Sequence, residues 1–328
     1  MMHRRHLLGA TAGLLAAPAL ATAQSAPWPT RAPVRLVAQF PPGGLVDTIT
    51  RLVAPPLSAA LGQNVLVENR AGAGGVIGTD YVAKQPADGY TFLMTHASVM
   101  VYSAATLPRL PFDPVADFTH LAHLVEASSV LLVRGDSPIR SFADYLNAAR
   151  TRPTRYGSSG IGSAPHMLGA MLGGTANLIQ LDHAPYTGSA PAMRDLLGGH
   201  IESLIDPITT NVEAMQNGTL RALAISTPER LPAFPNVPTF VELGFPGLVQ
   251  TQWVGISGPK NLPQPIAERM MREMPDIMRN ANIVTRTTEL QTLARPSLPL
   301  GPDFVNIMTT ELAAAREVAR RYNIQAGV

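Results

Sequence analysis

Short apolar segments alternate with amphipathic segments along most of this chain, and this alternation limits the possible folds more than any other feature. Val34 to Phe40 is typical of a buried strand, and Val46 to Leu61 has the period of a helix, which Pro55-Pro56 is expected to kink or split. Alternation with helical segments of about 10–15 residues indicates an α/β fold with mainly parallel sheets. Further strands are predicted at 65–68, 91–95, 130–134, 154–158, 179–184, 203–206, 222–226 and 253–257, and further helices at 265–280 and 302–322.

The first 23 residues have the features of an export signal. Arg4 and Arg5 precede an apolar stretch from Leu7 to Leu20, and Ala21-Thr22-Ala23 fits the small-residue cleavage rule. The stretch is shorter than the about 20 apolar residues of a membrane-spanning helix. The pattern favours a signal over a buried N-terminal helix. It predicts removal of residues 1–23 and export to a bacterial periplasm by the Sec or the Tat route.

Charge and composition exclude several functional classes. The chain has 25 basic and 23 acidic residues, and two of the basic ones lie in the predicted signal, so the mature chain has 25 − 2 = 23 of each and a formal charge of 0. No basic stretch remains to bind nucleic acid. The chain has no cysteine, which excludes disulfides and zinc–cysteine sites. His120 and His123 have no third metal ligand nearby in the sequence. They are therefore expected to lie in a packed segment that binds no metal. The glycine-rich run at 72–78 has Ile77 where a dinucleotide loop has its third glycine, so no cofactor is expected.

Two segments run from a predicted strand through small residues into a predicted helix. The first is Pro41-Pro42-Gly43-Gly44, and the second runs from Gly157 to Ser163. A helix N-terminus presents unpaired N–H groups and a partial positive charge, and glycine allows a ligand to approach the backbone. Such loops are ordinary turns in many α/β proteins. One in each half of the chain also suggests two lobes that hold an anion between them.

Several polar side chains lie next to these two loops. Asp47 is expected in the first turn of its helix, where it stabilises the helix, orients the loop or accepts a ligand's ammonium, and Arg51 is its possible partner one turn on. Ser163 and His166 lie one turn apart and, with Asp206, are the candidates for a hydrolase triad. The simpler interpretation is favoured, in which Ser163 caps the helix and His166 donates a hydrogen bond.

A series of short motifs occurs in a fixed order along the chain. They are Phe40-Pro41-Pro42-Gly43-Gly44 with Asp47 and Arg51, Glu68-Asn69-Arg70-Ala71-Gly72-Ala73-Gly74-Gly75, Asp88-Gly89-Tyr90-Thr91, Tyr156-Gly157-Ser158-Ser159-Gly160, Gly162-Ser163 with His166, Pro185-Tyr186-Thr187-Gly188-Ser189-Ala190-Pro191-Ala192, Asp195-Leu196-Leu197-Gly198-Gly199, Asp206, Arg221-Ala222-Leu223-Ala224, Pro235-Asn236-Val237-Pro238-Thr239 and Trp253-Val254-Gly255. With these motifs the chain resembles, from about residue 30 to its end, the periplasmic solute receptors of tripartite tricarboxylate transporters, called the Bug family. Thr187 and Ala170 stand where relatives often carry a lysine and a glutamate, which leaves the bound acid open.

The resemblance implies a type II periplasmic binding protein with two lobes. Each lobe is expected to be a mostly parallel sheet flanked by helices, with residues 30–129 and 252–328 in lobe 1 and residues 130–251 in lobe 2. The chain is expected to cross between the lobes near Ser128 to Val130 and to return near Thr251 to Trp253, which makes a hinge.

The same resemblance implies a receptor without catalytic activity that binds a small organic acid in the interlobe cleft. It would deliver the acid to a membrane permease of the tripartite tricarboxylate type. The residues expected to line the cleft are Pro41, Pro42, Gly43, Gly44, Asp47, Thr95, Ala97, Ser98, Ser158, Ser159, Gly162, Ser163, His166, Tyr186, Gly188 and Asp206. Two alternatives use the same cleft, namely a periplasmic serine hydrolase and a ligand-dependent signalling receptor that contacts a sensor kinase.

Overall fold

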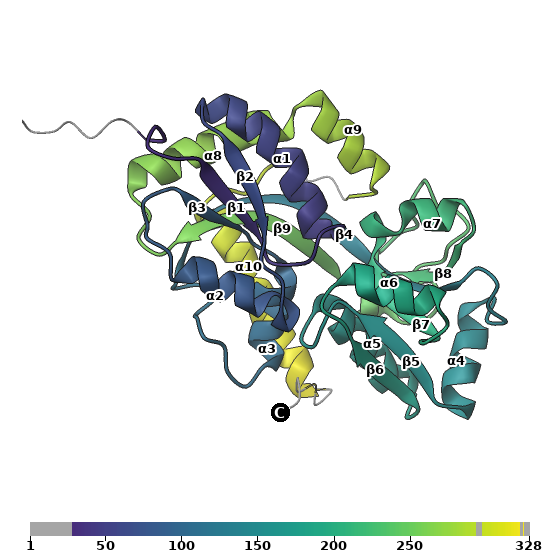
Figure 1. Cartoon of the computed structure of the whole chain (residues 1–328). Helices are drawn as coiled ribbons and strands as arrows, with labels where there is room; N and C mark the ends of the chain where they lie inside the picture. The colour runs from purple at the N-terminus through teal and green to yellow at the C-terminus, as the bar shows by residue number, and fades with distance from the viewer. Residues whose placement is uncertain (1–27, 293–296, 322–323, 325–328) are drawn as a thin grey trace, which may run out of the picture.

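Figure 1 shows two bodies of helices and strands that are joined through one long strand. The computed structural model describes residues 28–292, 297–321 and 324, so the predicted export signal lies outside the described residues. The strands are β1 (Val34–Ala38), β2 (Val65–Asn69), β3 (Thr91–Met94), β4 (Phe118–Arg134), β5 (Thr154–Ser158), β6 (Leu181–Pro185), β7 (Ser203–Pro207), β8 (Leu220–Ile225) and β9 (Thr251–Pro259). The helices are α1 (Leu45–Leu61), α2 (Val76–Ala83), α3 (Ala104–Thr106), α4 (Phe142–Thr151), α5 (Ala164–Ala176), α6 (Ser189–Leu197), α7 (Val212–Gln216), α8 (Gln264–Met278), α9 (Ala281–Glu289) and α10 (Pro302–Arg321).

The strands have the order β2-β1-β3-β9-β4-β7-β5-β6, with β8 paired to β4. β1 is parallel to β2 and β3, and β5 is parallel to β6 and β7, whereas β4 is antiparallel to β7, β8 and β9. β4 pairs with β9 over Phe118 to Ser128 and with β7 and β8 over Ser129 to Arg134. The predicted α/β architecture with flanking helices is confirmed.

β4 divides the molecule into two groups of elements. We call β1–β3, α1–α3, α8–α10, β9 and the first part of β4 the terminal half, and α4–α7, β5–β8 and the last part of β4 the inserted half. The sequence predicted a strand only at 130–134. The observed strand is far longer because both of its faces are covered, so almost every residue from Phe118 to Val133 is buried or nearly so and no alternation marks it.

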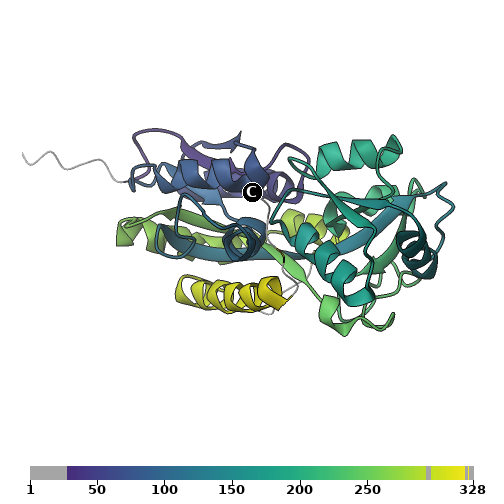
Figure 2. The same ribbon diagram turned by 90° about the horizontal axis from the view of Figure 1, so that it is seen from below.

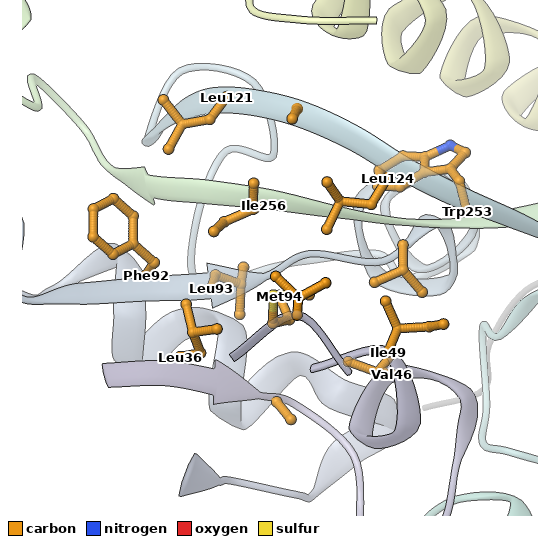
Figure 3. Close-up of a cluster of buried hydrophobic side chains, with 14 of the residues drawn as sticks. Leu36, Val46, Ile49, Phe92, Leu93, Met94, Leu121, Leu124, Trp253 and Ile256 are labelled. Carbon is orange, nitrogen blue, oxygen red and sulfur yellow. The ribbon is translucent and has the colours of Figure 1, made fainter. Parts of the chain in front are cut away.

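Each half has its own hydrophobic core. In the terminal half the main cluster combines residues before β4 with residues from β9 onwards, and Figure 3 shows Leu36, Leu93 and Ile256 of neighbouring strands beside Val46 and Ile49 of α1. In the inserted half, two clusters cover the sheet, and both are built from residues between Val130 and Leu248. The first part of β4, from Phe118 to Ala127, contributes to the core of the terminal half, and its last part, from Val130 to Val133, contributes to the clusters of the inserted half. Whether the lobe boundaries fall at 129/130 and 251/252 stays a prediction.

Two helices of the terminal half, α1 and α10, pack against its strands. The prediction that Pro55-Pro56 kinks or splits α1 is wrong for the split, because one helix continues through both prolines, with Val53, Ala54 and Leu57 buried around them. In Figure 2, α10 runs along one side of the strands. Its last turn reaches the inserted half, where Ala319 packs with Met167 of α5. Among the described residues, no helix is long and apolar enough to cross a membrane.

Candidate ligand-binding site

The loop at residues 41–44 joins β1 to the N-terminus of α1. Gly44 is the N-cap and supplies no side-chain cap, and Gly43 has a φ of +85°, in the left-handed region that favours glycine. The Gly43 amide donates to Oδ2 of Asp47, at 3.0 Å. One carboxylate of α1 thus fixes the loop in front of its own helix.

The Asp47 carboxylate is held from three sides. Besides Gly43, it accepts from Asn69 Nδ2 at 2.8 Å and from Arg51 Nε at 3.0 Å. Burial alone raises the pKa of Asp47, but the hydrogen bonds from Arg51, Gly43 and Asn69 outweigh it and hold the pKa below its usual value. Asp47 therefore orients the loop as an ionised group, and its predicted pairing with Arg51 is confirmed.

The loop at residues 158–163 joins β5 to the N-terminus of α5. Ser163 Oγ accepts from the His166 amide at 3.3 Å, so the predicted cap is confirmed. The prediction that His166 donates is wrong at its Nδ1, because this atom accepts from the Gly162 amide at 3.0 Å. The loop therefore uses the imidazole as its acceptor, in the place that Asp47 takes in the other loop.

A second histidine supports this loop. His183 Nε2 lies 2.6 Å from Ser158 Oγ, and the His183 ring stacks on His166 with 4.0 Å between the ring centroids. Burial lowers the pKa of His166 to about 4 and that of His183 to about 3. Both imidazoles are therefore neutral near pH 7.

The two loops belong to different halves, and each touches the opposite half. A Cβ on Gly188 would lie 2.7 Å from Cδ of Pro41, and one on Gly160 would lie 3.0 Å from Cα of Gly74. The space between the two halves is so narrow at these points that only glycine fits without a shift. Here the terminal and inserted halves are in van der Waals contact.

Hydrogen bonds also cross between the halves. The Ala164 amide, at the start of α5, donates to Ser98 Oγ at 3.2 Å, and Ser103 Oγ donates to the Gly162 carbonyl at 3.2 Å. Ser98 and Ser103 are the ends of the π-helical segment η2 (Ser98–Ser103) of the terminal half. The predicted site residues Ser98, Gly162 and Ser163 are thus brought together.

Several buried side chains carry at least one polar atom without a hydrogen-bond partner, and they lie where the terminal and inserted halves meet, which we call the seam. They lie on or just after five strands that are consecutive neighbours, β1, β3, β9, β4 and β7. These residues are Gln39, Thr95, His96, Gln252, Ser128, Thr209 and Asn211, and each is at most 5% exposed. Buried polar atoms normally have partners, and in α/β folds ligands bind at the carboxyl ends of strands. The unpaired atoms that follow the carboxyl ends of β1, β3 and β7 make the seam the candidate ligand-binding site.

Asp206, the last candidate, lies one residue before the end of β7 and is fully buried. Its carboxylate accepts from Ser189 Oγ at 2.6 Å, Thr210 Oγ1 at 2.7 Å and Asn211 Nδ2 at 2.9 Å. Burial outweighs these neutral donors and raises the pKa of Asp206 to about 6. The carboxylate is thus engaged by Ser189, Thr210 and Asn211, and the hydrogen bonds of a Ser–His–Asp triad are not formed with Ser163 and His166.

The remaining predicted residues lie around this seam and differ in their burial and hydrogen bonds. Ala97 and Ser159 are buried, whereas the Tyr186 hydroxyl donates to Asp195 Oδ2 at 2.8 Å. Asp47 lies behind the first loop. Sequence motifs did not indicate Gln39, Ser128 or Gln252, whose only signal is a polar residue within or at the end of an apolar strand. The role of all these residues in binding stays a prediction.

Solved structures with this architecture are periplasmic binding proteins. MatC from Rhodopseudomonas palustris with bound malate is 28% identical, superposes with a TM-score of 0.83, and the match covers 88% of this chain and 99% of MatC. A second R. palustris protein, solved with adipate, is 30% identical with a TM-score of 0.84, and the match covers 91% of this chain and 99% of that protein. The fold and the two facing loops therefore define a periplasmic solute-binding protein.

The chain belongs to the tripartite tricarboxylate transporter family receptors, the TctC family, whose model matches residues 49–293. Protein BugT of Bordetella pertussis is 35% identical over 282 residues, which cover 84% of this chain and 83% of BugT. The family resemblance inferred from the motifs is confirmed.

Proposed function

We propose that this protein is a periplasmic receptor that binds a small carboxylate-bearing organic acid between its two halves and delivers it to a permease of the tripartite tricarboxylate type. Two glycine loops at helix N-termini, facing each other across the seam, support this proposal. Relatives of similar fold carry malate and adipate. The predicted lining residues from Pro41 to Asp206 are the proposed site.

The unpartnered buried side chains of the seam are the observation that carries the proposal. Side chains such as Gln39, Thr95 and Ser128 offer hydrogen-bond donors and acceptors that a ligand's oxygens, or bridging water, can pair with. Among the described residues, no lysine or arginine is buried. A carboxylate would therefore be held by neutral donors and helix ends, which is compatible with later release to a permease.

We further propose that the halves move as lobes, 30–129 with 252–328 against 130–251. The two crossings lie side by side, because Ser128 pairs with Thr251 in the antiparallel ladder. Opening about these crossings would separate Pro41 from Gly188 and Gly74 from Gly160, and permease docking would favour one arrangement by binding it better.

The proposal is tested with the mature chain, residues 24–328, and a panel of organic acids that includes malate and adipate. Thermal unfolding is measured first, because a ligand at about a hundred times its Kd raises the free energy of unfolding by about 2.7 kcal/mol. We expect at least one acid to stabilise the protein and to bind saturably in calorimetry. If none of the panel does so, the proposal is wrong.

Gly43→Asp locates the site, since it places a carboxylate where the acid's carboxylate would lie. We expect affinity for the bound acid to fall by at least about tenfold through like-charge repulsion. Gly218→Asp is the matched control, because Gly218 also has a positive φ and open space around it. Equal affinities of the two variants would contradict the role of the first loop.

A further inference from the structure

A second cavity lies beside α10, outside the two glycine loops. Its volume is about 300 Å³, and its walls come from both halves of the molecule. The terminal half contributes Tyr102 of η2 and one face of α10, and the inserted half contributes Met167 and Met171 of α5. The complete lining is Tyr102, Met167, Met171, Gly247, Val249, Gln250, Thr251, Glu311, Ala314, Ala315 and Val318.

The walls of this cavity are mainly apolar. Met167, Met171 and Val318 line it together with Ala314 and Ala315, and none of these side chains offers a hydrogen-bond donor. A methionine side chain is unbranched and polarisable, so it adapts to the shape of a ligand and makes favourable contacts with the edge of an aromatic ring. A cavity of about 300 Å³ lies at the lower end of the range for small-molecule sites. The walls and the volume therefore suit a compound with a single aromatic ring.

Among the lining residues that the structure describes, one buried side-chain oxygen has no hydrogen-bond partner. Gln250 is 7% exposed, and its Oε1 is the unpaired atom. The rest of this side chain is engaged, because burial raises the pKa of the Tyr102 hydroxyl and a hydrogen bond from Gln250 partly offsets that rise. The Tyr102 hydroxyl in turn donates to the Thr251 carbonyl at 3.2 Å. A buried acceptor without a donor is costly, so an occupant that brings one O–H or N–H group would complete this cavity.

The charges around the cavity favour a neutral occupant. No lysine or arginine is among the lining residues that the structure describes, so an anion would be buried there without a counter-charge. Glu311 accepts from Trp253 Nε1 at 2.6 Å, so its carboxylate is engaged within the protein. The occupant that matches these walls therefore has no formal charge and one hydrogen-bond donor.

We propose that this cavity is a binding site for a small neutral aromatic compound that carries one hydrogen-bond donor, such as a phenol. The hydroxyl would donate to Gln250 Oε1, and the ring would pack against Met167, Met171 and Val318. Such a ligand differs in charge and polarity from the acid proposed for the seam.

A phenol bound here would contact both halves at once. It would touch α10 and η2 of the terminal half and α5 of the inserted half, beside residues 249–251, where the chain returns between the halves. The fit therefore depends on the relative position of the halves, although it does not require that an organic acid be bound in the seam.

The test is a calorimetric titration of the mature chain, without any organic acid, with 4-methylphenol as the probe. The control compound is 4-fluorotoluene, which keeps the ring and the methyl group and has a fluorine in place of the hydroxyl. We expect saturable binding of 4-methylphenol and at least about tenfold weaker binding of 4-fluorotoluene, because the fluorine leaves Gln250 Oε1 unpaired. Absence of saturable 4-methylphenol binding, or equal affinity for the two compounds, would overturn the proposal.

Gln250→Met tests the acceptor, because methionine has a similar length and cannot replace the amide oxygen. The affinity for 4-methylphenol should fall to that for 4-fluorotoluene, while the affinity for 4-fluorotoluene should stay unchanged. A general loss of structure would weaken both compounds. An unchanged affinity for 4-methylphenol in this variant would show that its hydroxyl does not meet Gln250, and the proposal would be wrong.

A second variant locates the ring without touching a buried residue. Ala314 is exposed on α10 and lines the cavity, so Ala314→Phe should fill it and lower the affinity for 4-methylphenol at least about tenfold. Ala313→Phe is the matched control, because Ala313 is exposed on the same helix outside the lining. Equal affinities of these two variants would place the compound elsewhere and refute the site.

Discussion

The two loops that face each other across the seam have the same backbone design but different supports. In the terminal half, the Gly43 amide is fixed by the charged Asp47 carboxylate, which Arg51 neutralises. In the inserted half, the Gly162 amide is fixed by the uncharged His166 imidazole. Both acceptors are buried, Asp47 at 4% and His166 at 9% exposure, but the Arg51 side chain that pairs with Asp47 is 53% exposed. The charged acceptor is thus accompanied by a guanidinium that neutralises it, whereas the neutral acceptor needs no counter-charge.

The two buried aspartates extend this comparison. Hydrogen bonds that include a guanidinium hold the pKa of Asp47 down, while the hydroxyls and the amide around Asp206 leave its pKa raised to about 6. Both carboxylates have several donors, so the number of hydrogen bonds does not explain the difference. The neighbouring positive charge of Arg51 explains it, since the groups that donate hydrogen bonds to Asp206 are all neutral.

The largest effect is expected where the inserted loop touches the terminal half. Gly160→Val would push a branched side chain against Gly74 Cα and the Tyr186 carbonyl, which a Cβ alone would meet at 3.0 and 3.2 Å. We expect the affinity for the bound organic acid to fall by about a hundredfold, or about 3 kcal/mol, because the halves cannot meet. Calorimetry measures this against Gly218→Val, which shares a positive φ but has open space. Equal affinities would show that the contact is not needed for binding.

Asp206 should make the protein less stable as the pH rises. Its folded pKa of about 6 lies above the ordinary value of 3.8. Its contribution to the free energy of unfolding is therefore fully present below pH 3.8 and is lost as the pH rises through 6. The loss is roughly 2–3 kcal/mol. The free energies of unfolding of the wild type and of Asp206→Asn are measured in urea at pH 4.5 and pH 7. Relative to the wild type, the variant should be more stable at pH 7 than at pH 4.5. A pH-independent difference would contradict the raised pKa.

Asp47 should show the opposite pH dependence. Because its folded pKa lies below 3.8, its contribution is present above that pH and is lost as the pH falls through the folded pKa. Asp47→Asn should therefore lower the free energy of unfolding by about 1–2 kcal/mol at pH 7. In urea titrations the difference from the wild type should shrink in acid below pH 4. If it grows instead, Asp47 is not held as the ionised form.

The smallest effect is expected at the cap of α5. Ser163→Ala removes the hydroxyl that accepts from the His166 amide, which should cost about 1 kcal/mol of stability. Ser163→Thr keeps an accepting hydroxyl and should cost less. Thermal unfolding compares the two variants, and equal losses would argue against a capping role.

Features that depend on residues close together in the sequence were predictable. The loops at 41–44 and 158–163, the Ser163 cap and the Asp47–Arg51 pair each follow from residues close together in sequence. The full length of β4 was not predictable, because a strand buried on both faces lacks alternation.

The polar residues of the seam were not predictable for a different reason. Gln39, Ser128 and Gln252 become neighbours only through the strand order, which places β1, β9 and β4 close together. No motif links them along the chain. The direction of the His166 hydrogen bond likewise depends on which backbone amide the fold brings to its ring.

The long strand β4 also affects the order in which the chain can fold. Thr119 on β4 donates to Pro259, which lies 140 positions further along the chain, so this sheet is completed only after everything between them has been spanned. The cores of the inserted half use one continuous stretch of chain. We therefore expect the middle of the chain to acquire protected amides first in pulse-labelled hydrogen exchange, and the half that contains both described ends of the chain to close around it last.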